Sequence, residues 1–202
     1  MISELGLLWM TGLPLMGSPG PATLSVAAAG AAYGPKRGLR YMLGVSAGTA
    51  SVLVMIASGV TGLVLAVPGA AVSITILGAF YILYLAYAIA TAPVLDKVDV
   101  RAKAPRFAGG YVLAIANPKA YAALGAIVSS TSVLPEVPVW DAVAKIAALS
   151  VLVFIINGTW LMLGSAISAL MTDPRKSRVV NLVMAALLLI LWLWCLSERP
   201  RP

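Results

Sequence analysis

Two short proline-containing motifs hold the residues of this sequence that are best placed to build a chemical site. Residues 18–21 read Ser-Pro-Gly-Pro and residues 117–119 read Asn-Pro-Lys, and Pro118 follows Pro19 by 99 positions (118 minus 19) in a chain of 202 residues. Proline lacks the N–H that a helix interior needs, and its ring clashes with the preceding turn. Each motif therefore predicts an interrupted helix whose freed backbone groups are available to a ligand.

Lys119 gives the second motif a charge and a ligand preference. Half-helices that begin near Pro21 and Pro118 direct N-termini of about +0.5 charge each toward the freed groups, where anions are favoured. A lysine within an apolar segment is costly and marks a functional site by default. We expect its ammonium to bind a substrate carboxylate, to be neutral, or to reach water along its four methylenes. None of the seven acidic residues lies inside an apolar segment: Glu4, Asp96, Asp99, Glu136, Asp141, Asp173 and Glu198.

The composition places these motifs in a membrane protein. Hydrophobic residues make up 61% of the chain, charged residues only 10%, and the mean hydropathy is +0.98. These values differ greatly from those of a soluble domain. At about 20 residues per crossing, the apolar runs predict a single membrane domain of six transmembrane helices and no β-barrel. The predicted spans are residues 5–32, 41–67, 70–92, 107–134, 143–170 and 179–196.

Lysine and arginine predict the orientation of these spans. Ten basic residues fall on one side: Lys36, Arg37, Arg40, Lys97, Arg101, Lys103, Arg106, Arg175, Lys176 and Arg178. Only Lys145, Arg199 and Arg201 fall on the other side. Because basic loops stay in the cytoplasm, we predict a multi-pass protein of the cytoplasmic (inner) membrane with both termini outside. The same rule accounts for the net charge of +7 without a nucleic-acid partner.

The spacing of the two motifs predicts an inverted repeat. Residues 1–95 form the first repeat, residues 96–106 a linker, and residues 107–202 the second repeat. Three spans are an odd number, so the second repeat enters the membrane from the opposite face. We therefore predict an all-α 3+3 inverted repeat with helices 1 and 4 broken at mid-membrane, where the breaks face each other. Freed backbone groups at that depth must line a polar cavity or meet a ligand.

Other polar and small residues within the spans carry weaker signals. The Asn157 amide is expected either to touch substrate or to bond a neighbouring helix. Hydroxyl side chains are expected to bond their own helix backbone: Thr23, Ser25, Ser46 and Thr49. The spacings Gly30-x-x-x-Gly34 and Gly44-x-x-x-Gly48 permit close helix contact, within one chain or in a dimer. Lys145 is expected to pair with Asp141 one helical turn before it.

The residues around both motifs resemble the lysine exporter and threonine/homoserine exporter family (LysE/RhtB type). The resemblance covers nearly the whole chain and rests on residues 18–48, 76–89 and 107–127. It implies six-span exporters of amino acids and related small metabolites, driven by the proton gradient and often dimeric. It also implies that the two motifs form the substrate region, with Gly78 and Tyr81 nearby. The candidate substrate-binding residues are Pro19, Gly20, Pro21, Thr23, Thr49, Gly78, Tyr81, Asn117, Pro118, Lys119 and Asn157.

The chain departs from the family pattern at Thr49, where many relatives carry an acidic residue, and it contains no histidine. If transport is coupled to protons, Lys119 is the titratable residue at depth, and our hypothesis is that it loses and regains the proton.

These residues bear on four possible functions. The first is a secondary exporter of amino acids or related small carboxylate-bearing metabolites, working by alternating access around the broken helices. A metal-ion exporter is disfavoured, because the predicted spans hold no Asp, Glu or His and a single Cys. A membrane-embedded hydrolase would pair Ser18 or Ser25 with Lys119 as base, and a channel would use the broken helices as a filter. We predict a non-enzyme without cofactors whose partners are a small-molecule substrate and the lipid bilayer, with a homodimer left open.

Overall fold

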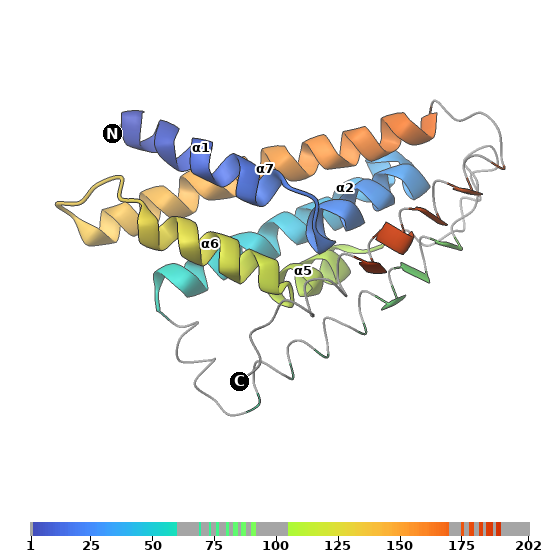
Figure 1. Cartoon of the computed structure of the whole chain (residues 1–202), viewed down its shortest axis with the longest axis horizontal. Coiled ribbons are helices and arrows are strands. Elements are labelled where there is room, and N and C mark those ends of the chain that lie inside the picture. Colours follow the sequence, from blue (N-terminus) through green and yellow to red (C-terminus); the bar gives the residue numbers. More distant parts are fainter. Residues whose placement is uncertain are drawn as a thin grey trace.

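The computed structural model describes residues 2–59 and 105–169 without gaps, and single residues within 69–91 and 175–190. The described elements are all helices: α1 (Ile2–Gly17), α2 (Pro21–Ala57), α5 (Phe107–Ile115), α6 (Pro118–Ser130) and α7 (Pro138–Ala169). They lie alongside one another in an elongated bundle (Figure 1). The third and sixth predicted spans fall largely outside the described residues. Gly78 and Tyr81 lie outside them as well.

Both predicted helix interruptions are present. α1 ends at Gly17 and α2 begins at Pro21. α5 ends at Ile115 and α6 begins at Pro118, with a bend of 62° between the two helices. In both cases proline stands in the first turn of the following helix, where its missing N–H would be unpaired anyway and its fixed φ suits the helix.

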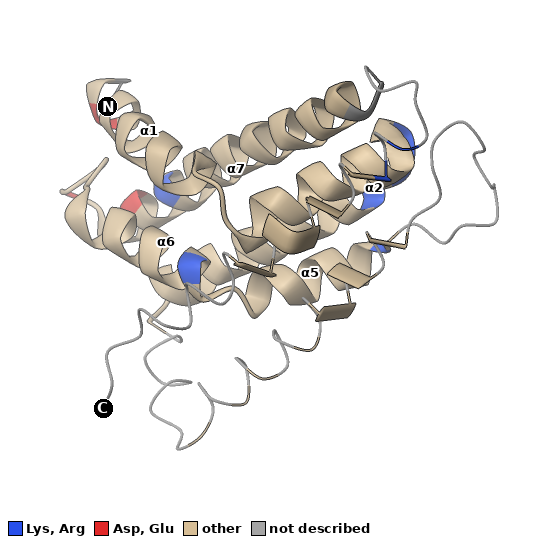
Figure 2. Ribbon diagram, turned by 45° about the vertical axis from the view of Figure 1, so that its right-hand side comes forward, with Lys and Arg blue, Asp and Glu red and all other residues tan. Residues whose placement is uncertain are grey.

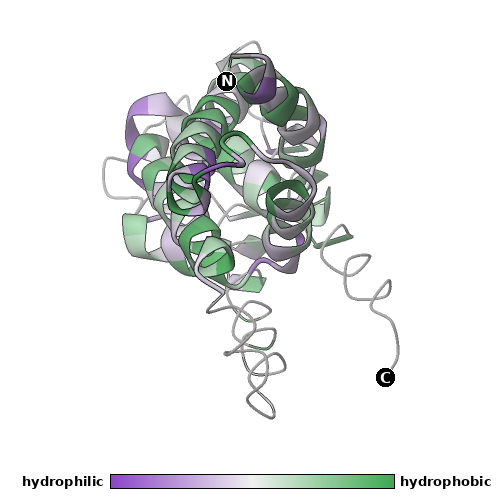
Figure 3. Cartoon of the chain, turned by 90° about the vertical axis from the view of Figure 1, so that its left-hand side faces the viewer, coloured by the Kyte–Doolittle hydropathy of each residue, from purple (hydrophilic) through white to green (hydrophobic). Residues whose placement is uncertain are grey.

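The helices of the bundle have the length and composition of membrane spans. α2 and the segment Pro138–Ile167 of α7 are each long and apolar enough to cross a bilayer, and the bent pair of α5 and α6 would make a third crossing. Large apolar side chains such as Met10, Val139 and Met162 are exposed. Figure 3 shows hydrophobic residues distributed through the helices of the bundle. The prediction of an all-α membrane protein is therefore confirmed.

The boundary between the first two predicted spans differs from expectation. The basic stretch predicted between them is helical, and Gly34 is the one residue inside α2 with non-helical dihedrals, at φ 73° and ψ 169°. Glycine adopts such a positive φ readily, and Pro35 suits a helix start. The chain folds back at Gly34. This is seen in the short distance of 3.4 Å between a Cβ atom built on Gly38 and the Ala29 carbonyl oxygen. Nine residues of straight helix would span about 13 Å. A one-residue bend therefore replaces the expected loop.

Glycines bring α2 into backbone contact with two other helices. A Cβ atom on Gly48 would lie 2.6 Å from the Tyr111 carbonyl oxygen, and one on Gly44 would collide with the Phe107 carbonyl oxygen of α5. Gly34 divides α2 into a first arm (residues 21–33) and a second arm (residues 35–57). In the first arm, a Cβ atom on Gly30 would collide with the Leu161 carbonyl oxygen of α7. These three glycines therefore permit close helix contact within one chain. Gly34 has nothing within 4 Å of its Cβ position and serves the bend instead.

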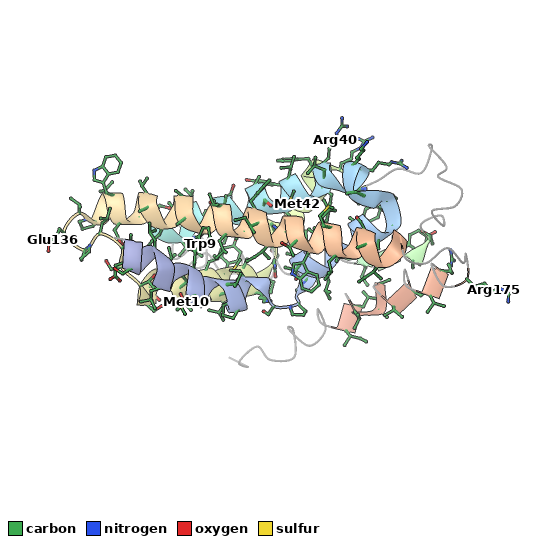
Figure 4. The ribbon with its side chains drawn as sticks, turned by 90° about the horizontal axis from the view of Figure 1, so that it is seen from above. Trp9, Met10, Arg40, Met42, Glu136 and Arg175 are labelled. Carbon is green, nitrogen blue, oxygen red and sulfur yellow. The ribbon has the colours of Figure 1, made fainter. Side chains whose placement is uncertain are left out.

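The charged residues of the described helices separate toward the two ends of the bundle (Figure 2). Acidic residues colour the end that carries the N-terminus, and most basic residues colour the opposite end. Figure 4 places Glu136 at the first end and Arg175 at the second. Two lysines interrupt this separation, one in α6 and one in α7: Lys119 and Lys145.

Candidate functional site

A cavity lies where the two helix breaks meet the second arm of α2 and the middle of α7. Its volume is about 30 Å³, enough for about two water molecules. Six apolar or small residues form part of its wall: Leu15, Met16, Ala22, Ala120, Val153 and Ile156. The other lining residues are Gly20, Thr23, Thr49, Asn117, Lys119 and Asn157. The described lining contains no Asp or Glu.

The first break is closed by a local hydrogen-bond turn. Gly20 is the N-cap of α2, and its backbone N–H donates to the Thr23 hydroxyl at 3.0 Å. The same hydroxyl donates to the carbonyl oxygen of Gly20 at 3.2 Å. Pro21 has no backbone N–H to donate. The Thr23 hydroxyl therefore stabilises the start of α2 through the backbone N–H and carbonyl oxygen of Gly20. The prediction that Thr23 bonds local backbone is confirmed.

The second break is capped by its own asparagine. The Asn117 side-chain oxygen accepts a hydrogen bond from the Lys119 backbone N–H at 3.2 Å. This is the usual way in which an N-cap residue satisfies a free amide. Asn117 is 5% exposed, so its side chain fixes the start of α6 inside the protein.

The Lys119 side chain joins the two breaks. Its ammonium nitrogen Nζ donates to the Ser18 carbonyl oxygen at 2.8 Å and to the Ser18 hydroxyl Oγ at 2.8 Å. It also donates to the Pro19 carbonyl oxygen at 3.2 Å. No acidic partner is predicted for this lysine within the apolar segments. The structure instead supplies neutral oxygens, because the helix that ends at Gly17 leaves carbonyl groups with no amide to accept from.

Gly20 makes room for this contact. A Cβ atom at Gly20 would lie 2.9 Å from both Cδ and Nζ of Lys119. Since real Cβ atoms do not approach that closely, any side chain at this position would displace the lysine. The absence of a side chain at Gly20 thus determines how Lys119 sits.

Two further residues complete the end of α1, and sequence reasoning missed both roles. The Trp160 indole Nε1 donates to the Gly17 carbonyl oxygen at 3.2 Å. The Ser18 hydroxyl donates to the Leu15 carbonyl oxygen at 3.0 Å while it accepts from Lys119. The position of Ser18 in the Ser-Pro-Gly-Pro motif could have indicated its role in the sequence. Nothing in the sequence pairs Trp160 with a residue 143 positions away.

The remaining polar residues of the cavity are mostly held by protein groups. Thr49 donates to the Val45 carbonyl oxygen of its own helix at 2.9 Å, as predicted. Asn157 Nδ2 donates to the Ser46 hydroxyl at 3.0 Å, so this amide joins α7 to α2 and also lines the cavity. The alternative in which Asn157 bonds a neighbouring helix is therefore confirmed, and its contact with a substrate stays a prediction.

The structure brings together six of the candidate substrate-binding residues in the cavity wall: Gly20, Thr23, Thr49, Asn117, Lys119 and Asn157. Three prolines, Pro19, Pro21 and Pro118, stand at the breaks and outside the lining. Their role is to end and start helices, except that the Pro19 carbonyl oxygen accepts from Lys119. The binding role of all these residues stays a prediction.

Lys145 belongs to a separate cluster. Its ammonium lies 2.7 Å from the Asp141 carboxylate and donates to the Val128 carbonyl oxygen at 3.1 Å. Asp141 also accepts from the Leu134 backbone N–H at 2.8 Å. The predicted pair is confirmed, and it ties the end of α6 to the start of α7 outside the cavity lining.

An all-α membrane protein whose cavity lies between two broken helices has the architecture of a small-molecule transporter. Residues 13–196 match the LysE type translocator family, and the chain belongs to that family. This membership and the efflux relatives described next support amino-acid export across a membrane.

Several curated relatives share about the same length of sequence. The cysteine/O-acetylserine efflux protein of Salmonella typhi is 29% identical over 172 residues, which cover 85% of this chain and 86% of the relative. The protein of that name from Escherichia coli K12 is 29% identical over 175 residues, with coverage of 85% and 86%. The one from Escherichia coli O139:H28 is 28% identical over 176 residues, with coverage of 85% and 87%. No solved structure matches the chain.

Proposed function

We propose that this protein is a secondary transporter that exports amino acids or related small carboxylate-bearing metabolites across the cytoplasmic membrane, by alternating access around its two broken helices. The observation that carries the proposal is the cavity at which both breaks meet, bridged by Lys119. Broken helices at a shared cavity supply both freed carbonyl groups and helix N-termini. An amino acid, with its ammonium and carboxylate, needs both.

The substrate we propose is a small neutral amino acid or its O-acetyl derivative. The matched relatives are named for efflux of cysteine and O-acetylserine. The apolar part of the cavity wall suits a short uncharged side chain: Leu15, Met16, Ala22, Ala120, Val153 and Ile156. A dibasic amino acid would bring a second ammonium, and the described lining offers it no carboxylate.

We further propose the six-span inverted repeat with both termini outside. Two observations support it. α1 and one arm of α2 pack on α7, while the other arm of α2 packs on α5, so each broken helix lies against a helix of the other half. The charged ends of the bundle match the expected membrane sides, since the basic end would face the cytoplasm (Figure 2).

Topology is testable with single cysteines placed at the two ends. In a Cys195→Ala background, Glu136→Cys should react with a membrane-impermeant maleimide added to intact cells, and Arg40→Cys should react only after the cells are opened. The reverse labelling pattern would contradict the orientation. A homodimer, if formed, would use surfaces other than Gly44 and Gly48, because these pack on α5 within the chain.

The hydrolase alternative rests on the hydrogen bond between Lys119 Nζ and the Ser18 hydroxyl. A catalytic base must accept the serine proton. Here Lys119 donates to three oxygens, and Ser18 donates to the Leu15 carbonyl oxygen. This pattern favours a charged ammonium held by acceptors and supports a protein that is not an enzyme. Within the described residues, no group of three His, Cys, Asp or Glu side chains is placed to hold a metal ion.

Transport into inside-out membrane vesicles tests the proposal directly. Vesicles from cells that overproduce the protein should take up radiolabelled cysteine and O-acetylserine with saturation, and each unlabelled compound should compete with the other. Vesicles without the protein give the background, and Lys36→Met, an exposed change near the bend of α2, is the matched control variant. Absence of uptake above background for a full panel of amino acids would contradict export of this class. Uptake that rises linearly without saturation would favour a channel.

A further inference from the structure

The oxygens that hold Lys119 form a receptor for a primary ammonium group. Nζ has three acceptors, at 2.8 Å, 2.8 Å and 3.2 Å. A lysine ammonium carries three N–H donors, and each of these oxygens can accept one. We call these three atoms, Ser18 O, Ser18 Oγ and Pro19 O, the ammonium receptor. The α-ammonium of an amino acid is the same chemical group.

The receptor atoms carry the partial negative charge that a cation needs, because two are carbonyl oxygens and one is a hydroxyl oxygen. They follow the C-terminal end of α1, whose dipole favours a cation, and precede the N-cap of α2, whose dipole does not. Neutral donors serve the adjacent carbonyl groups: Trp160 for Gly17, and the Ser18 hydroxyl for Leu15. The lysine cation donates to the next two carbonyl groups, those of Ser18 and Pro19, and the Thr23 hydroxyl also donates to the Ser18 carbonyl oxygen at 3.4 Å.

Building on the proposed function, we propose that the ammonium receptor binds the α-ammonium of the transported amino acid, and that Lys119 fills the receptor until the substrate displaces it. The released lysine then pairs with the substrate carboxylate. After the exchange the receptor still holds an ammonium group, which is now that of the substrate. Lys119 has left neutral oxygen acceptors and gained an anionic partner.

This exchange selects zwitterions. An amine without a carboxylate would leave two cations in a cavity whose described lining has no Asp or Glu, and like charges at such depth repel strongly. A carboxylate without an amine would draw Lys119 away and leave the receptor oxygens without an ammonium donor. A compound with both groups avoids both costs.

The size of the cavity agrees with displacement. About 30 Å³ holds water but no amino acid. Lys119 is itself part of the wall, so its withdrawal enlarges the space at the point where the substrate ammonium would sit. Gly20 lies against Lys119 and borders the same space.

The receptor can be tested without any transport substrate. Purified Lys119→Met protein in detergent should be stabilised by methylammonium chloride relative to tetramethylammonium chloride, which has no N–H donor. We expect a saturable rise in melting temperature of about 2–4 °C. Wild type and Lys36→Met, whose receptor is filled, should show no difference between the two salts. Equal melting temperatures for Lys119→Met in both salts would overturn the proposal.

A second variant keeps the test decisive if Lys119→Met does not fold. Lys119→Ala removes the lysine stem, and n-propylammonium replaces the lost atoms together with the ammonium. Recovery of monodisperse protein or a higher melting temperature with n-propylammonium, and not with tetramethylammonium, is expected. Failure of both variants to respond to their amines overturns the receptor.

Selection for zwitterions is tested by competition against uptake of radiolabelled O-acetylserine by the wild type. Unlabelled O-acetylserine should compete at least 10-fold better than its methyl ester, which lacks the carboxylate, and than its N-acetyl derivative, which lacks the ammonium. In Lys119→Met the methyl ester should now raise the melting temperature. Equal competition by the zwitterion and the methyl ester would overturn the exchange. If the wild type takes up no amino acid, the proposed function fails, and the methylammonium experiment still decides the receptor.

Discussion

Lys145 and Lys119 are both held within the helix bundle, and they find their acceptors differently. Lys145 pairs with the carboxylate of Asp141, 2.7 Å away in the same helix. Lys119 reaches neutral oxygens of Ser18 and Pro19, about 100 residues earlier in the chain. Separating the first pair would leave two buried charges, so it acts as a permanent brace. Neutral oxygens accept any ammonium, so the second contact is exchangeable.

The surroundings of the two lysines fit these different roles. The Asp141 carboxylate also binds backbone N–H groups of the segment between α6 and α7, which joins the two helices firmly. Lys119 lines a cavity together with Gly20 and Asn157. A charge that must stay in place has a charged partner, whereas a charge that must move has neutral ones.

The largest expected effect is on stability, from Lys145→Met. The uncompensated Asp141 carboxylate should lower the free energy of unfolding by about 3–5 kcal/mol. Thermal unfolding in detergent measures the loss. The double variant Asp141→Asn with Lys145→Met should lose less, and transport per folded molecule should stay near the wild-type rate. A fully stable Lys145→Met protein would remove the distinction between the two lysines.

Lys119→Met should show the opposite pattern. It removes the proposed partner of the substrate carboxylate, a charge-assisted contact worth about 1.5–3 kcal/mol, so export should fall by about 10- to 100-fold. Loss of stability should be smaller than in Lys145→Met, because no buried carboxylate is left behind. Vesicle uptake and thermal unfolding of the same preparations give both values. Export at the wild-type rate would contradict a role for Lys119 in the site.

Gly20→Ala tests whether the position of Lys119 matters apart from its charge. The added methyl group would lie 2.9 Å from Nζ and Cδ of Lys119, so it should displace the ammonium. We expect export to fall by about 10-fold, which corresponds to the loss of one charge-assisted hydrogen bond of about 1.5 kcal/mol. Gly125→Ala in α6, where nothing lies within 4 Å, is the matched control. If the two alanine variants export equally well, the close approach at Gly20 has no functional role.

Ser18→Ala should have the smallest effect of the four. It removes one of three acceptors and leaves both carbonyl oxygens in place, so a loss of about 1 kcal/mol, or roughly 5-fold in apparent affinity, is expected. The concentration dependence of vesicle uptake measures it. Complete loss of transport would instead favour a chemical role for the Ser18 hydroxyl, as the hydrolase alternative requires.

The helix breaks were predictable because proline acts locally. Pro21 and Pro118 start helices within one residue of the predicted half-helix starts, since a missing N–H has the same effect in any tertiary context. The pair of Asp141 and Lys145 was predictable for a similar reason, because residues four apart share a helix face. The bend at Gly34 was missed, since a basic stretch between apolar runs does not distinguish a loop from a single positive φ.

The candidate site was predicted in its residues and not in its contacts. Asn157 and Thr49 line the cavity as expected, yet only the fold shows that Asn157 bonds Ser46 of α2. The acceptors of Lys119 were not predictable, because two of them are backbone carbonyl oxygens, which every residue carries. A sequence contains no mark for a carbonyl group that has lost its amide partner at a distant helix end.

By itself, the sequence determined that this chain is a bundle of apolar helices with two interruptions and a lysine at one of them. Those features follow from covalent chemistry and from the cost of polar groups away from water, both of which act over a few residues. The tertiary structure alone decided that Lys119 lies on the oxygens of Ser18 and Pro19. That contact depends on α1 and α6 being packed side by side, which the glycine contacts of α2 with α5 and α7 help to fix.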